Sequence, residues 1–151
     1  MLGAGDKVGE LFKMLNPIDR TASRAGAFAY KVEPYVIAAD IYGEPPHTRR
    51  GGWTWYTGAA GWLYQAGLES ILGFQVRADK LTLKPCIPRT WRSYEITYRY
   101  RESTYLITVD NPNAMSVGVS RLVLDGVPQL GDTIALSNDG LSHRIHAIMG
   151  D

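Results

Sequence analysis

The sequence predicts an α+β protein in two parts, helical up to about residue 73 and rich in strands after it. Before Gly73, apolar residues recur at helical spacing, whereas after it short β-branched and aromatic runs follow one another. Turn signals such as Asn138-Asp139-Gly140 separate those runs. Strands at this spacing predict an antiparallel β-sandwich over residues 74–151.

Size and composition restrict the function. The chain has 151 residues, of which 45% are hydrophobic and 11% aromatic, so it can build a core. A net charge of +1 without charge blocks indicates neither a nucleic acid nor an anionic membrane as partner. The single Cys86 excludes an internal disulfide framework. Because there is no long apolar run and no signal pattern, we expect a cytoplasmic protein without a membrane segment.

Three helices are predicted in the first part. The first covers residues 6–15, where an apolar stripe has helical spacing, and Asn16-Pro17 ends it. Residues 18–30 are predicted as a loop. The second helix runs from Glu33 to Tyr42 and is apolar nearly all round, and the third runs from about Gly58 to Leu72. Three helices cannot bury such a second helix, so we expect residues 1–73 to be the end of a larger helical domain.

The strands of the second part are predicted from β-branched and aromatic runs bounded by turn residues. They cover residues 81–83, 94–101, 104–109, 121–124, 133–136 and 143–148. Cys86, between Pro85 and Ile87, is expected in the core.

The segment from Arg49 to Trp62 carries the strongest signal for a binding site. It holds two arginines, three tryptophans, a tyrosine and several glycines. Aromatic faces suit sugar rings, and glycines let a ligand approach the backbone. We therefore interpret it as part of a sugar and phosphate site, with Trp53 and Trp55 as sugar-binding candidates. Alternatively, two or three of the aromatic residues of this segment belong to the core.

The start of the third helix is the candidate phosphate site. If Thr57 is the N-cap, Ala60 stands where a capping box needs Glu or Gln, so the amides of Gly58 and Ala59 remain available to an anion. The alternative is an ordinary helix start whose amides bind water.

Other polar residues give weaker signals. Glu33 and Asp40 lie seven apart on the predicted helix, roughly on one side, which suits sugar hydroxyls or structural hydrogen bonds. His143 and His146 are three apart in a predicted strand and point to opposite faces, and His47 has no metal-ligand partner at a suitable spacing. The sequence thus predicts no metal site.

Several motifs in order resemble one family. They are Leu15-Asn16-Pro17-Ile18, Tyr30-Lys31-Val32-Glu33-Pro34-Tyr35-Val36, the run from Gly51 to Trp62, Ile71-Leu72-Gly73, and Leu83-Lys84-Pro85-Cys86-Ile87-Pro88. Over most of residues 5–110 the chain resembles the C-terminal part of the inverting glycoside phosphorylases that act on cellobiose and chitobiose. Within that group it most resembles the phosphorylase region of cyclic β-1,2-glucan synthases.

The resemblance implies a fold and a reaction. Residues 1–73 would be the last helices of an (α/α)6 barrel, and residues 74–151 a C-terminal β-sandwich. Inorganic phosphate, as co-substrate and without a cofactor, would attack the anomeric carbon of a β-linked glucan with inversion. Thr57 and Gly58 map onto the family's phosphate-binding pair. Glu33, with Tyr35 and Asp40 near it, maps to the sugar-binding side.

Two differences from the family matter. Asp19-Arg20 stands where members carry an Asn-His pair, and we expect Arg20 to take over the phosphate contact. The general acid, an aspartate, would lie upstream in the remainder of the barrel. The chain therefore contains no catalytic residue of its own and is expected to be inactive, as a fragment of a longer enzyme. The resemblance leaves inner-membrane association of a full-length synthase open. The alternatives are a stand-alone carbohydrate-binding or subunit-like module, and a piece of a barrel glycosidase that uses water.

Overall fold

A computed structural model describes residues 3–151, without the side chain of Thr57. The chain forms two compact units, which are described separately. The helical unit is Glu10–Gly67, and the β unit comprises Met1–Gly9 and Leu68–Asp151. Among the described residues, no helix is long and apolar enough to cross a bilayer. Helices and sheets are both present, which confirms the predicted combination of the two.

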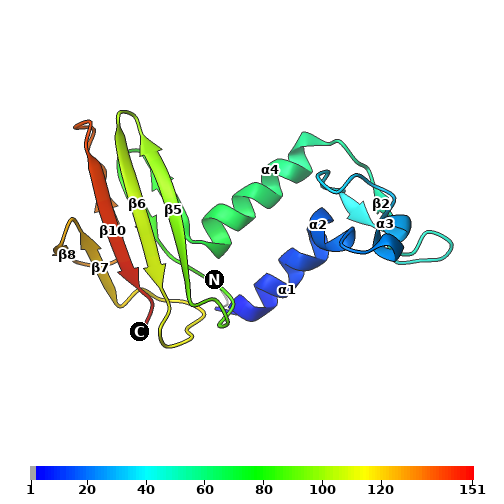
Figure 1. The fold of residues 1–151 in the computed structure, drawn as a ribbon, viewed down its shortest axis with the longest axis horizontal. Helices are drawn as coiled ribbons and strands as arrows, with labels where there is room; N and C mark the ends of the chain where they lie inside the picture. Colours follow the sequence, from blue (N-terminus) through cyan, green and yellow to red (C-terminus); the bar gives the residue numbers. More distant parts are fainter. Residues whose placement is uncertain (1–2) are drawn as a thin grey trace. The chain divides into compact units, whose positions relative to one another are not determined.

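Two sheets make up the β unit (Figure 1). The larger sheet has the order β5-β6-β10-β7-β8, and the smaller one has the order β3-β4-β9. Their strands are β3 (Phe74–Arg77), β4 (Lys80–Leu83), β5 (Ser93–Tyr100), β6 (Ser103–Asp110), β7 (Arg121–Leu124), β8 (Val127–Gln129), β9 (Thr133–Ala135) and β10 (Ser142–Ile148). All six predicted strands are present, whereas β3 and β8 were not predicted.

One strand pair differs from the antiparallel expectation. β10 pairs with β6 in parallel, with His143 opposite Tyr105 and His146 opposite Thr108. The other pairs in both sheets are antiparallel. The direction of β10 follows from the crossover, because the chain passes through β9 in the other sheet before it returns. The sheet order could not be predicted from local patterns.

The core of the β unit is formed by side chains from one face of each sheet, because buried and exposed side chains alternate along the strands. Tyr105, Ile107 and Val109 of β6 are buried, while the residues between them are more exposed. The smaller sheet adds Leu81 and Ile134, both almost fully buried. These inward faces explain why the strands could be located from their period of two. The remaining members of this core include Phe74, Leu83, Ile87, Leu122, Ile145, Ala147, Met149 and the predicted core residue Cys86.

In the first 30 residues the structure is more helical than predicted. α1 (Gly5–Leu15) agrees with the predicted first helix. The predicted loop over residues 18–30 is wrong, since it contains α2 (Pro17–Arg20) and α3 (Arg24–Tyr30). The side chain of Asn16 accepts from the Ile18 amide, and that of Ser23 accepts from the Gly26 amide, so each short helix has an N-cap.

The predicted second helix is absent. Residues 33–39 are irregular, and β1 (Asp40–Ile41) pairs with β2 (Gly51–Gly52) in a small antiparallel sheet. Glycine permits this pairing, because a Cβ at position 51 would lie 2.7 Å from the side chain of Val32. The apolar residues of this segment are not buried all round, as Val36 is buried but Tyr35 is 71% exposed.

The predicted third helix is two helices in sequence. α4 (Thr57–Gln65) is an α-helix, and η1 (Ala66–Ile71) continues it with π-helical hydrogen bonding. Gly73 ends the helical stretch as predicted. It has a φ of +71°, and a Cβ there would lie 2.1 Å from the carbonyl carbon of Lys84.

Candidate functional site

The aromatic side chains of the segment from Arg49 to Trp62 point outward, both before α4 and in it. Trp53, Trp55 and Trp62 are 64%, 67% and 74% exposed, so the expectation that two or three aromatic residues of this segment lie in the core is wrong. The Trp53 and Tyr56 rings pair with centroids 5.8 Å apart, and the Tyr35 and Trp55 rings pair at 6.2 Å. Flat aromatic faces open to solvent are suited to contact with sugar rings.

The backbone here is strained in a way that side-chain packing does not explain. Arg49, Trp53 and Trp55 have φ values of 72°, 51° and 66°, in the left-handed region. Non-glycine residues adopt this region at a cost of about 1–2 kcal/mol each. Arg49 precedes β2 (Gly51–Gly52), and Trp53 and Trp55 follow it. Clusters of such residues are often found where the backbone conformation serves a ligand.

The start of α4 is open. Tyr56, not Thr57, is the N-cap, and it makes no side-chain capping hydrogen bond. Thr57 is thus the first helical residue, and its side chain lies outside the described part. Gly58 is exposed, with no atom within 4 Å of the place a Cβ would take, and Ala59 is half-buried. Free amides at the start of a nine-residue helix can bind an anion.

The other predicted site residues lie on separate elements. Arg20, on α2, donates from Nε to the Met14 carbonyl, which engages part of its guanidinium. Glu33 is exposed in the irregular segment, so the helical argument that placed it beside Asp40 fails. Asp40 lies on β1, and its Oδ1 would be 2.4 Å from a Cβ at position 52.

A groove of about 350 Å³ forms in the helical unit, and the sequence did not predict it as a whole. Among the predicted residues only Trp53 lines it. Among the described residues, those that line it are Lys31, Val32, Tyr42, His47, Arg50, Gly51, Gly52, Trp53 and Thr54. The signal that could have revealed it is the Arg-Gly-Gly-Trp run, but the contributions of Lys31 and His47 depend on the β1–β2 pairing.

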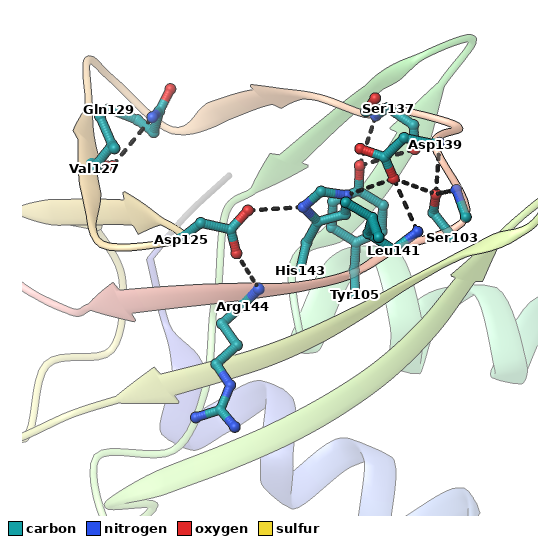
Figure 2. Close-up of polar contacts among 11 residues, drawn as sticks. Ser103, Tyr105, Asp125, Val127, Gln129, Ser137, Asp139, Leu141, His143 and Arg144 are labelled. Carbon is teal, nitrogen blue, oxygen red and sulfur yellow. Dashed lines mark hydrogen bonds and ion pairs between the residues drawn. The ribbon is translucent and has the colours of Figure 1, made fainter.

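In the β unit, a polar cluster surrounds His143 (Figure 2). Its Nδ1 lies 2.7 Å from Asp125 Oδ2 and its Nε2 lies 3.1 Å from Asp139 Oδ1. The ring stacks on Tyr105, with centroids 4.8 Å apart. The pKa of His143 is raised, mainly by its hydrogen bond to Asp125 and to a smaller extent by that to Asp139.

The cluster joins two turns. Asp125 Oδ1 accepts from the Arg144 amide at 2.7 Å, and Asp139 Oδ1 accepts from the Leu141 amide at 3.0 Å. The pKa of Asp139 is lowered to about 2, mainly by the hydrogen bond from the Leu141 amide and to a smaller extent by that with His143. Because these groups already satisfy one another, we interpret the cluster as structural.

The two histidines of β10 point to opposite faces, as predicted. The His143 side chain is 12% exposed, whereas that of His146 is 48% exposed and lies 2.8 Å from Asp110 Oδ2. Within residues 3–151, no group of three or more His, Cys, Asp and Glu residues is arranged to hold a metal ion.

Comparisons with known proteins assign both parts of the chain. Residues 1–73 match the family model of the glycosyl hydrolase 94 superfamily, catalytic domain. Residues 74–120 match that of the glycosyl hydrolase family 65, C-terminal domain.

Several characterised enzymes are similar in sequence. Cyclic beta-(1,2)-glucan synthase NdvB of Rhizobium meliloti (strain 1021) is 53% identical over 98 residues, which are 65% of this chain and 4% of the synthase. Solabiose phosphorylase of Paenibacillus borealis is 36% identical over 78% of this chain and 15% of its own length. N,N'-diacetylchitobiose phosphorylase of Vibrio furnissii is 35% identical over 99% of this chain and 18% of its own length. The chain thus spans less than a fifth of each of these relatives, and it is similar in sequence both to a glucan synthase and to glycoside phosphorylases.

Proposed function

We propose that this chain contributes to a carbohydrate-active enzyme that acts on β-linked glucans with inorganic phosphate. The reaction would be phosphorolysis with inversion, and it would belong either to glucan breakdown or to the synthesis of cyclic β-1,2-glucan. The observation that carries the proposal is the uncapped start of α4, which follows directly on the exposed tryptophans. A phosphate-binding helix start next to sugar-binding faces is the combination that phosphorolysis of a sugar needs.

The chain's part in the reaction is to hold the nucleophile. The amides at the start of α4 and the Thr57 hydroxyl would bind phosphate, and one phosphate oxygen would attack the anomeric carbon. That oxygen–carbon bond forms as the glycosidic bond breaks on the opposite face, and the leaving oxygen takes a proton from an acid. We expect this acid, an aspartate, from the rest of the catalytic domain. The products are an α-glucosyl phosphate and a shortened glucan.

Sugar binding is assigned to the aromatic faces and to polar groups near them. Trp53 and Trp55 are the exposed platforms, and Tyr35 pairs with Trp55. Asp40 and Glu33 are exposed carboxylates that can accept from sugar hydroxyls. We keep Arg20 as a phosphate candidate, with its Nη groups, since the bond to Met14 uses Nε.

The test uses a longer protein that joins this chain to the rest of the catalytic domain. We expect it to release glucosyl phosphate from a β-glucan only when phosphate is present. Thr57→Ala is expected to weaken phosphate binding by about 10–100-fold, the effect of losing one hydrogen bond to a charged group. Turnover with water alone would instead indicate a glycosidase, and would contradict the proposal.

A second candidate is a carbohydrate-binding or subunit-like module without catalysis. The exposure of Trp53 and Trp55 in this chain favours it, because solvent-facing tryptophans can bind a glucan by themselves. Glucan binding by the 151-residue chain, together with no turnover by the longer protein, would support this candidate over phosphorolysis.

A further inference from the structure

The groove of the helical unit collects three basic side chains from two parts of the chain. Lys31 follows α3 as its C-cap, while His47 and Arg50 lie on the connection between β1 and β2. Backbone hydrogen bonds order that connection. The Arg50 amide donates to the His47 carbonyl at 2.9 Å, and the Tyr42 amide donates to the Arg50 carbonyl at 2.9 Å. The three side chains are therefore presented by a defined backbone.

The charge of the groove favours an anion. None of the nine described residues that line it is acidic, while Lys31 and Arg50 are cationic and His47 offers a ring N–H donor. Arg suits phosphate through its fork of donors, and Lys acts as a point charge.

The groove also has groups that suit a sugar. Trp53 lines it and is 64% exposed, so its face is free for a ring. Glycine at position 52 leaves the backbone close to two polar groups, since a Cβ there would lie 2.4 Å from Asp40 Oδ1 and 2.6 Å from the Tyr42 hydroxyl. The Tyr42 phenol lines the groove and can bind a sugar hydroxyl, whereas Asp40 lies beside Gly52 but is not one of the lining residues.

We propose that this groove binds a phosphorylated sugar, with the phosphate on Lys31, His47 and Arg50 and the sugar ring on Trp53. The volume of about 350 Å³ lies in the range of small-molecule sites, roughly 300–1,000 Å³, and suits a sugar phosphate better than a free phosphate ion. The choice of ligand class rests on the proposed function, since an inverting phosphorolysis yields such a sugar phosphate. The groove is distinct from the phosphate position at the start of α4 as far as the described residues show, because Gly58 does not line it.

The test measures binding to the full 151-residue chain by calorimetry, with glucose 1-phosphate, glucose and inorganic phosphate as probes. We expect glucose 1-phosphate to bind more tightly than either of the other two. Lys31→Gln and Arg50→Gln should each weaken its binding by about tenfold, the effect of losing a charged hydrogen bond. Arg99→Gln, which removes an exposed cation from β5 of the other unit, is the matched control and should leave the affinity unchanged.

Other results would overturn the assignment. Absence of glucose 1-phosphate binding, equal affinity for glucose, or equal losses in the groove variants and the Arg99→Gln control would each contradict it. If Thr57→Ala weakened glucose 1-phosphate binding while Lys31→Gln and Arg50→Gln did not, the ligand would bind at the start of α4. That result would contradict the groove assignment but would be compatible with the proposed function. Conversely, losses confined to the groove variants would support the groove even if the longer protein fails the phosphorolysis test. If Arg50→Gln does not fold, as judged by circular dichroism, Lys31→Gln alone provides the comparison with Arg99→Gln.

Discussion

The β unit buries most of its large apolar side chains, whereas most aromatic side chains of the helical unit are exposed to solvent. Leu81 and Ile107 are 0% and 1% exposed, while Trp55 and Trp62 are 67% and 74% exposed. Two sheets can close a core between their inner faces, but short helices and a two-residue strand pair cannot. The helical unit therefore presents a surface suited to contact with other groups, either sugar or further protein.

The largest expected difference concerns independent folding. We expect a chain of residues 1–73 to show no cooperative thermal transition, because its exposed aromatic side chains leave little buried apolar area to offset chain entropy. The complete chain should show a cooperative transition, because the β unit supplies a core. Circular dichroism and calorimetry would measure both, and a sharp transition in residues 1–73 would contradict the comparison.

The second prediction compares the loss of stability when a large apolar side chain is truncated in each unit. Ile107→Ala is expected to lower the free energy of unfolding by about 2–5 kcal/mol, because it leaves a cavity beneath β6. Trp62→Ala should change it by less than about 0.5 kcal/mol, as expected for an exposed position. Urea unfolding of both variants tests the pair. If Trp62→Ala were as destabilising as Ile107→Ala, the tryptophan would have a packing role that its exposure does not indicate.

Two asparagines offer a finer comparison. Asn111 is fully buried, and its side chain bonds the carbonyls of Trp91 and Met115 and accepts from the Met115 amide at 2.7 Å. Asn111→Ala should cost about 1–3 kcal/mol or more, since it leaves buried backbone groups without partners. Asn16→Ala removes the N-cap of α2 together with the exposed hydrogen bond from Asn16 Nδ2 to Asp19 Oδ2, and should cost about 0.5–2 kcal/mol of local helix stability. Urea unfolding measures the first change and hydrogen exchange in α2 the second, and equal global effects would contradict the comparison.

The smallest expected effect is a pH dependence within the β unit. The pKa of His143 is raised in the folded state, so its stabilising contribution is complete below its unfolded pKa and is lost as pH rises through the folded value. The pKa values of Asp125 and Asp139 are lowered, so their contribution is lost as pH falls through their folded values. The cluster should therefore be strongest between about pH 4 and about pH 6.5.

The variant His143→Gln provides the control for that effect. The urea midpoint of the native chain should fall relative to that of the variant as pH rises from about 6 to about 8. Parallel curves for the two proteins would show that the ion pairs with Asp125 and Asp139 add no pH-dependent stability.

Local patterns in the sequence determined the larger part of the β unit. Alternation along β6 located its buried residues, and turn residues located the strand ends, because side chains in a strand change face at every position. The motif that runs into α4 likewise located the candidate site, since glycines, tryptophans and an uncapped helix start are local features. Gly73 marked the end of the helical stretch for the same reason, as its φ of +71° suits glycine.

Only the tertiary structure decided three other features. Apolar residues after Glu33 predicted a helix, but this part of the chain pairs as β1 with β2 instead. The pairing places Asp40 opposite Gly52 and Ile41 opposite Gly51, so it depends on glycines further along the chain. The parallel pairing of β10 with β6 follows from a crossover between sheets. The groove brings Lys31 together with His47 and Arg50, which are distant along the chain. Each of these depends on contacts between distant segments, which local spacing does not encode.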